Sequence, residues 1–395
     1  MYSKYGLQLI KHALLPSTIL GSSSIHFSPE TKTFYTTKFS RRNLLLGSTI
    51  LISFTVFFSW RTLEIFLWKG GKSNEYFRMC FVLSLAFVMF SSVSIFINVR
   101  QCDICQVLTR LVRYCSKFED EWMSNYDPKK SLTGFGLDIL LLSGIFFFSC
   151  IVPWPSLAHY LLFPETPVFP TTLLPPQLAT DPIVYVGYAV IVSYYACLAW
   201  QLMFIAWLLL CVIYIFSVMP LLKCEFRIGA KNQKCVKSFR SVWILSIHYR
   251  CIELIHRHLM DIDGIIILGL HSFIGQIVLF ANVTVILFRE EIGVNLMVIL
   301  LVWSFSGQLL WASALEICAR FSAYAKKTVS SWRRMEFRNT QEKAYMAKFM
   351  KSCRPLRMGK EGMFVITKVA APKFMRSVVT GTFRAMITLR RARYK

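Results

Sequence analysis

The placement of positive charge between long apolar stretches constrains this chain more than any other feature. Seven stretches are long enough, or nearly so, to span a bilayer. Four of the intervening segments hold 32 of the 45 Lys and Arg residues: 1–42, 100–133, 220–262 and 320–360. Three alternate segments hold five: 61–78, 156–182 and 289–293. Loops with a Lys/Arg excess lie in the cytoplasm. The pattern predicts an all-α membrane protein with seven transmembrane helices, a cytoplasmic N-terminus and an extracellular C-terminus.

The net charge of +24 raises the question of nucleic-acid binding. Most of that charge lies on the segments assigned to the cytoplasm, where it orients the chain and meets anionic lipid. Residues 183–218 are almost uncharged, as expected of a chain whose apolar residues are gathered into membrane spans. We therefore expect membrane lipid, and no nucleic acid, among the partners.

The boundaries divide the chain into four parts. Residues 1–42 are expected to form a cytoplasmic tail, residues 43–320 the first six spans, residues 321–361 a cytoplasmic helix, and residues 362–395 the seventh span with a short tail. Amphipathic spacing of apolar residues also predicts helices below the membrane at 236–260 and 321–350. In the last span, Lys373, Arg376, Thr380 and Arg384 follow one helical stripe, which predicts a helix that is not surrounded by lipid.

Aromatic side chains gather in the outer halves of the third and fourth spans. An aromatic belt at the membrane interface explains some of them, but Tyr194 and Tyr195 lie deeper than such a belt. The alternative is a pocket for a small organic ligand, since such pockets are mostly apolar with a few placed polar groups. A proline-rich loop over 164–182 is expected to form a stiff outer lid. The candidate ligand-binding residues are Trp154, His159, Tyr160, Tyr188, Tyr194 and Tyr195.

Nothing in the sequence predicts an enzyme, a cofactor or a metal site. There is no Gly-rich phosphate loop, no nucleophile elbow and no zinc-protease motif. The Cys102/Cys105 pair has no second pair at suitable spacing, and His248, Cys251, His256 and His258 do not share one helical face. Gln201, Gln276 and Gln308 lie near the middle of spans, where inter-helix packing is favoured over a cavity lining.

Residues 352–366, with the Pro355-Leu356 pair, resemble the segment that leads into the seventh helix of the insect gustatory and odorant receptor superfamily. The chain length, the seven spans, the inside N-terminus and the cytoplasmic helices also fit this family. The gustatory signature of the last helix, Thr-Tyr and Gln-Phe around five apolar residues, is not present at 381–389. The chain therefore resembles a divergent, gustatory-receptor-like member.

The resemblance implies a chemosensory receptor in the plasma membrane that acts as a ligand-gated ion channel. It implies a homo- or hetero-tetramer, a small organic ligand in the outer half of the bundle, and a cytoplasmic anchor built from 236–260 and 321–357. The last helix would line the pore through Thr380, Phe383 and Ile387. Its basic stripe leaves three possibilities: the stripe faces away from the pore axis, the channel does not select cations, or a partner subunit is needed.

Two other functions compete with this one. A secondary transporter would have six spans and an interfacial C-terminal helix, with internal repeats and broken helices. A G-protein-coupled receptor would need the opposite orientation, and the chain lacks Asp-Arg-Tyr and Asn-Pro-x-x-Tyr at the corresponding positions.

Overall fold

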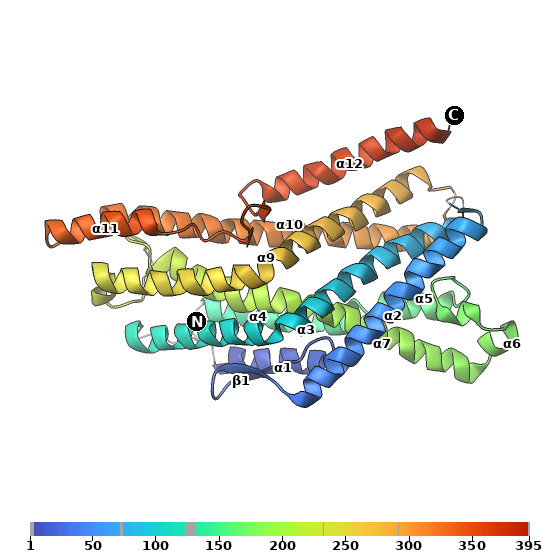
Figure 1. Cartoon of the computed structure of the whole chain (residues 1–395), viewed down its shortest axis with the longest axis horizontal. Helices are drawn as coiled ribbons and strands as arrows, with labels where there is room; N and C mark the ends of the chain where they lie inside the picture. The colour runs from blue at the N-terminus through green and yellow to red at the C-terminus, as the bar shows by residue number, and fades with distance from the viewer. Residues whose placement is uncertain (1–3, 72–73, 124–131, 232, 291, 394–395) are drawn as a thin grey trace.

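The chain forms an elongated bundle of long helices (Figure 1). The computed structural model describes residues 4–71, 74–123, 132–231, 233–290 and 292–393. Within those residues, six helical segments are long and apolar enough to cross a membrane: Lys38–Trp68, Tyr76–Trp122, Leu141–Leu162, Pro182–Glu225, Val242–Leu287 and Leu296–Arg334. A further long helix, α12, follows them. The prediction of an all-α membrane protein is therefore confirmed, with six apolar spans and a more polar last helix.

The N-terminal residues, expected to be a tail, are folded onto the bundle. Helix α1 (Lys4–Leu20) packs against α2, α4 and α7, and the antiparallel hairpin of β1 (Ile25–Ser28) and β2 (Thr33–Thr36) follows it. Ile10, Ala13 and Leu14 are buried because their spacing puts them on one helical face. Ser17 donates a hydrogen bond to Oε1 of Gln201 (2.9 Å), so that glutamine packs helices together.

Helices α2 (Lys38–Trp68) and α3 (Glu75–Trp122) form an antiparallel pair (Figure 1). Thr37 and Ser40 form a capping box at the start of α2. Hydroxyl pairs join the two helices: Ser48 with Ser94, Thr55 with Ser91 and Ser59 with Ser84, each 2.8 Å apart. Small residues and hydroxyls of this kind hold helices together where lipid removes the hydrophobic driving force.

The third and fourth spans are interrupted by wider turns. The third comprises α4 (Leu132–Phe146), the π-helical η3 (Phe147–Ile151) and α5 (Trp154–Leu162). A loop with the short helices η4 (Pro170–Leu173) and α6 (Pro176–Ala179) leads to the fourth. That span joins α7 (Pro182–Trp207), η5 (Leu208–Ile215), α8 (Phe216–Pro220) and η6 (Leu221–Glu225). Its most apolar stretch is 65% buried, the largest share among the six spans, so this span lies at the centre.

The two amphipathic segments that were expected below the membrane are continuous with spans. After the short η7 (Lys237–Arg240), α9 (Val242–Leu287) runs through both the amphipathic 242–260 segment and the fifth span. Likewise α10 (Val294–Ser331) extends past the sixth span before η8 (Trp332–Arg334) and α11 (Thr340–Ser352). Helix α9 meets η8 and α11 through aromatic contacts, with ring centroids of Tyr249 and Trp332 4.9 Å apart and those of Trp243 and Tyr345 4.2 Å apart.

A small hairpin precedes the last helix. Strands β3 (Gly359–Lys360) and β4 (Phe364–Val365) pair antiparallel, and Gly359 adopts φ 111°. A Cβ at Gly359 would lie 2.2 Å from the carbonyl oxygen of Phe364, and one at Gly264 would lie 3.2 Å from the Gly359 carbonyl. The hairpin therefore needs glycine both for its turn and for its close approach to α9.

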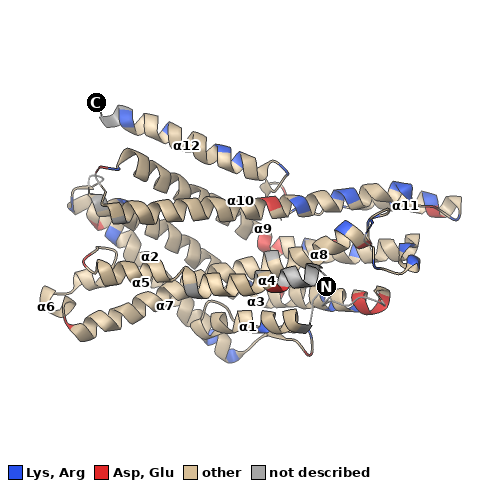
Figure 2. Cartoon of the chain, turned by 180° about the vertical axis from the view of Figure 1, so that it is seen from behind, with Lys and Arg blue, Asp and Glu red and all other residues tan. Residues whose placement is uncertain are grey.

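Helix α12 (Ala370–Arg393) begins eight residues later than the sequence suggested, because 362–369 complete the hairpin and a turn. It packs on α9 and α10 through the buried Phe374, Val378 and Thr382. Lys373, Arg376 and Arg384 are exposed, and these cations explain why α12 is less apolar than the six spans. Figure 2 shows Lys and Arg along α12 and gathered toward the end of the bundle that holds α11.

Candidate functional site

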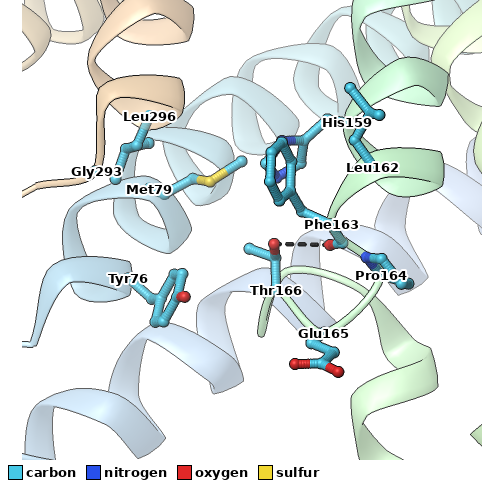
Figure 3. Close-up of a pocket in the computed structure, with 10 residues that line it drawn as sticks. All are labelled: Tyr76, Met79, His159, Leu162, Phe163, Pro164, Glu165, Thr166, Gly293 and Leu296. Carbon is cyan, nitrogen blue, oxygen red and sulfur yellow. Dashed lines mark hydrogen bonds between the residues drawn. The ribbon is translucent and has the colours of Figure 1, made fainter.

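A cavity of about 410 Å³ lies at the end of the bundle that holds α5 and α6 (Figures 1 and 3). The start of α3, the end of α5, the loop that follows α5 and the start of α10 form its walls. These elements are far apart in the sequence, and the antiparallel packing of the spans brings them together. The lining residues are Tyr76, Met79, His159, Leu162, Phe163, Pro164, Glu165, Thr166, Gly293 and Leu296.

The walls combine apolar side chains with polar ones, among them Glu165 and His159. Nε2 of His159 is buried and has no hydrogen-bond partner among the described residues. The His159 ring packs beside Phe163, with the centroids 5.6 Å apart, and Figure 3 shows both rings beside Met79. The hydroxyl of Thr166 donates to the carbonyl oxygen of Phe163 (2.8 Å). A cavity that mixes apolar side chains with a few polar groups suits a small organic molecule that carries a polar group.

Buried Arg61 of α2 holds the proline-rich loop over this cavity. Its Nε donates to the carbonyl oxygen of Pro167 (3.0 Å), and its Nη2 to the hydroxyl of Thr172 (3.3 Å). Its Nη1 forms an ion pair with Glu64, which also pairs with Lys69 at 2.8 Å. A guanidinium can bind the loop at several points because its donors form a rigid planar fork. Arg61 thus ties the loop that was expected to form a stiff lid to α2, in addition to the packing of Phe169 on His159 and Tyr160.

The structure separates the six candidate ligand residues. His159 lines the cavity, whereas Trp154 is 62% exposed at the start of α5. Tyr160 is buried, donates to the carbonyl oxygen of Tyr185 (3.2 Å), and packs against Phe169 of the loop that follows α5. Tyr188 is half-buried on α7.

The two deeper tyrosines of this set point in different directions. Tyr194 donates to the carbonyl oxygen of Leu20 (2.8 Å), which ties α7 to the end of α1. Tyr195 is buried, with its ring centroid 4.3 Å from that of Phe54 and 5.8 Å from that of Phe87. Both have partners in the folded bundle, so the geometry assigns them to packing between helices.

Sequence reasoning missed most of the cavity wall. Tyr76, Met79, Gly293 and Leu296 lie at helix starts and carry no motif of their own. The proline-rich loop was the available signal, since Pro164 and Thr166 belong to it. Among the described residues, no group of three or more His, Cys, Asp or Glu side chains could hold a metal ion.

The exposed face of α12 is a second candidate functional surface. Thr380, Phe383 and Ile387 are all exposed, and Phe383 and Ile387 are large apolar side chains. Lys373, Arg376 and Arg384 share this face, because it lies opposite the buried Phe374, Val378 and Thr382. The structure therefore brings the predicted pore residues and the basic stripe together on one face.

Comparison with solved structures identifies the fold. The chain superposes on the insect olfactory receptor OR5 from Machilis hrabei with a TM-score of 0.58 and 12% sequence identity, over 97% of each chain. The chain has the insect olfactory receptor fold. A second structure of that receptor, in complex with eugenol, matches with a TM-score of 0.58 and 13% identity, over 98% of this chain and 100% of that one. No family model and no curated protein sequence matches the chain.

The olfactory receptor fold confirms, at the level of structure, the resemblance that residues 352–366 suggested. Those residues form the end of α11, the hairpin and the connection between them. Leu356 and Met358 are buried there, which explains why this segment carries a recognisable pattern. The fold is that of a multi-pass membrane protein.

The Arg61 attachment predicts how the lid responds to mutation. Arg61→Met should raise amide hydrogen exchange in residues 164–174 at least about tenfold, because hydrogen bonds to a charged group contribute about 1.5–3 kcal/mol each. Arg100→Met is the control, since Arg100 is exposed and its pair with Asp103 stabilises little. Unchanged exchange in the Arg61 variant would show that the loop holds its position without this side chain.

Proposed function

We propose that this chain is a chemosensory receptor of the plasma membrane that acts as a ligand-gated ion channel. The observation that carries the proposal is the correspondence of fold, over nearly the whole chain, with an olfactory receptor. The structure of that receptor with eugenol supports a small organic molecule as the activating ligand. The ligand would bind in the outer half of the helix bundle.

The cavity beside His159 is the proposed ligand site. Its volume of about 410 Å³ falls within the range of small-molecule sites, roughly 300–1,000 Å³. Its apolar side chains would provide the burial energy, and a rotation of the His159 ring would let the buried, unpartnered Nε2 form one hydrogen bond with the ligand. Trp154, Tyr160, Tyr188, Tyr194 and Tyr195 would then act around this site and not within it.

The exposed face of α12 is the proposed pore lining. Exposed cations on a helix that crosses a bilayer must face water or other protein, because a charge in hydrocarbon is costly. A ring of α12 helices from several copies would place Thr380, Phe383 and Ile387 toward a common axis. We propose four copies, as a homo-tetramer or together with a partner subunit.

Apolar residues at the charged end of the bundle support the association of copies. Trp243, Ile247 and Leu254 on the first turns of α9 are 51%, 61% and 57% exposed. Their spacing puts them on one helical face. Lys and Arg gather at this end, so we place it outside the hydrocarbon of the membrane (Figure 2). An apolar stripe that faces water there is stabilised when another protein surface covers it. We assign this stripe to the contact between subunits.

The charge distribution supports the orientation. The described parts of the basic segments, 100–123, 220–231, 233–262 and 320–360, meet at the end that holds α11, and the cavity lies at the opposite end (Figure 2). The positive-inside rule then puts α11 in the cytoplasm and the cavity on the extracellular side. This places the ligand site where an external chemical would reach it.

The hairpin before α12 supplies a connection between the bundle and the pore. Nε1 of Trp311 on α10 donates to Nδ1 of His271 on α9 (2.8 Å). The His271 ring stacks on Phe364 of β4, with centroids 4.3 Å apart, and lies 5.6 Å from the ring of Phe374 of α12. A shift of α9 or α10 would therefore move the start of α12. A ligand shifts such a gate toward the open state only to the extent that it binds the open state more tightly than the closed state.

The alternative is a secondary transporter with six spans and an interfacial C-terminal helix. The wider turns of the third and fourth spans resemble the broken helices of transporters. However, α12 runs alongside α9 and α10 with a buried face on them, whereas an interfacial helix would cross their ends. The channel is therefore the better-supported function.

Ligand-evoked currents in cells that express the chain, alone and with a candidate co-receptor, test the proposal. If eugenol or another small phenol activates the receptor, His159→Phe should raise the half-maximal activating concentration about tenfold or more, because the hydrogen bond to the ligand is lost. It should not lower thermal stability, because it removes a buried atom that has no partner. The control, Trp154→Phe, changes an exposed side chain outside the cavity and should leave potency unchanged.

The basic α12 face predicts ion selectivity. Residues 362–395 contain no Asp or Glu, so a pore lined by Lys373, Arg376 and Arg384 should favour anions. Diluting external NaCl should shift the reversal potential of the ligand-evoked current toward positive values. Lys373→Gln/Arg376→Gln/Arg384→Gln should reduce this shift, whereas Lys343→Gln/Lys348→Gln/Lys351→Gln on α11 should not. A shift toward negative values would mean that these side chains do not face the permeating ions.

A further inference from the structure

A second cavity, of about 520 Å³, lies beside the cytoplasm-facing end of α10 as oriented above. Three parts of the chain form it: the last turns of α10 with η8, the residue Arg227 just after η6, and Lys368 in the turn before α12. Neither the proposed ligand site nor the pore uses it. Its lining residues are Arg227, Ala323, Lys326, Lys327, Ser330, Ser331, Arg334 and Lys368.

The lining is strongly cationic. Five of the eight residues are Lys or Arg, and none is acidic. Within the described ranges, none of these five cations forms an ion pair. Lys223 adds a sixth nearby cation, since its Nζ lies 5.8 Å from the ring centroid of Tyr324 on the same stretch of α10. The positive charges of such a cluster repel one another, and a bound anion would lower this electrostatic repulsion.

The fold holds part of this cluster in a fixed shape. Nη2 of Arg334 donates to the carbonyl oxygen of Ile228 (3.2 Å), while the backbone N–H of Ile228 donates to the hydroxyl of buried Ser331 (3.0 Å). The loop after η6 and the end of α10 are therefore tied together. Lys326, Lys327 and Lys368 are exposed and free to point into the cavity. One edge of the Arg334 guanidinium is anchored, and its other donors remain for phosphate oxygens.

We propose that this basic cavity binds a polyphosphorylated anion. Five positive charges balance two to three phosphate monoesters, each of which carries about −1.5 to −2 at neutral pH. The chemistry fits an inositol polyphosphate group, either as the headgroup of an inner-leaflet phosphoinositide or as the free soluble molecule. Because the cavity lies just beyond the apolar part of α10, both forms can reach it.

Occupation of the cavity would act on the pore through Lys368. This residue lies two positions before the start of α12, in a turn where the N–H of Ala370 donates to the carbonyl oxygen of Thr367 (2.9 Å). An anion that bridges Lys368 and the lysines of α10 would fix the start of α12 relative to α10. This regulatory step, unlike the binding itself, rests on the channel function proposed above.

Binding to the purified full-length protein tests the site without any need for channel activity. The probes are phosphatidylinositol 4,5-bisphosphate in nanodiscs of otherwise neutral lipid, and soluble inositol hexakisphosphate. The test variant is Lys326→Gln/Lys327→Gln/Lys368→Gln, and the matched control is Lys343→Gln/Lys348→Gln/Lys351→Gln on α11. Both variants remove three charges from exposed lysines.

We expect saturable binding of at least one probe by the parent chain and the control, and at least about tenfold weaker binding by the test variant. Binding of the lipid alone would identify the headgroup as the source, and binding of the soluble probe alone would identify the free polyphosphate. No saturable binding to either probe, or equal affinity in the two variants, would overturn the site. Binding without any ligand-evoked current would leave the site intact and overturn the channel proposal.

Discussion

The rest of the structure depends on how α12 avoids exposing its cations to lipid. A helix of 24 residues is long enough to cross a bilayer, yet α12 carries exposed Lys373, Arg376 and Arg384. Its buried face, with Phe374, Val378 and Thr382, is occupied by α9 and α10. The opposite face therefore needs water or other copies of the chain beside it. That requirement supports the proposed assembly of several copies around a polar path.

The hairpin between α11 and α12 links this requirement to the remainder of the molecule. Gly359 and Gly264 bring the hairpin within contact of α9, and His271 joins α9, α10 and Phe364 in one cluster. At the charged end, His256 of α9 makes a comparable link, since its ring nitrogens lie 2.6 Å from the hydroxyl of Tyr214 and 3.0 Å from the carbonyl oxygen of Arg357. The segment before α12 is thus held to α9 at two levels.

The sequence predicted the parts of the fold that follow from hydropathy and periodicity. Long apolar runs gave the six spans, and the i, i+3, i+7 spacing of Lys373, Arg376 and Thr380 gave the polar face of α12. The folded N-terminal residues were not foreseen, because α1 mixes polar and apolar residues and is ordered by its contacts with α4 and α7. The continuity of α9 was also missed, since no residue near Gly264 marks where an amphipathic segment becomes a membrane span.

The candidate site shows the same limit more sharply. His159 could be proposed from its place near the end of an aromatic span, but Tyr76 and Leu296 become its neighbours only through the antiparallel packing of α3, α5 and α10. Conversely, Tyr195 is of the residue type expected in a ligand site, but its ring packs against Phe54 and Phe87. Composition alone does not distinguish an aromatic side chain that packs helices from one that faces a cavity.

Thiol modification of α12 tests the central claim most directly. Thr380→Cys and Ile387→Cys lie on the exposed face, and Val378→Cys and Thr382→Cys lie on the buried face. A negatively charged methanethiosulfonate applied to the ligand-activated receptor should rapidly and irreversibly change the current at the two exposed positions. It should have little effect at the buried positions or on the parent chain. Equal effects on both faces, or labelled exposed positions with unchanged current, would contradict a pore lined by this face of α12.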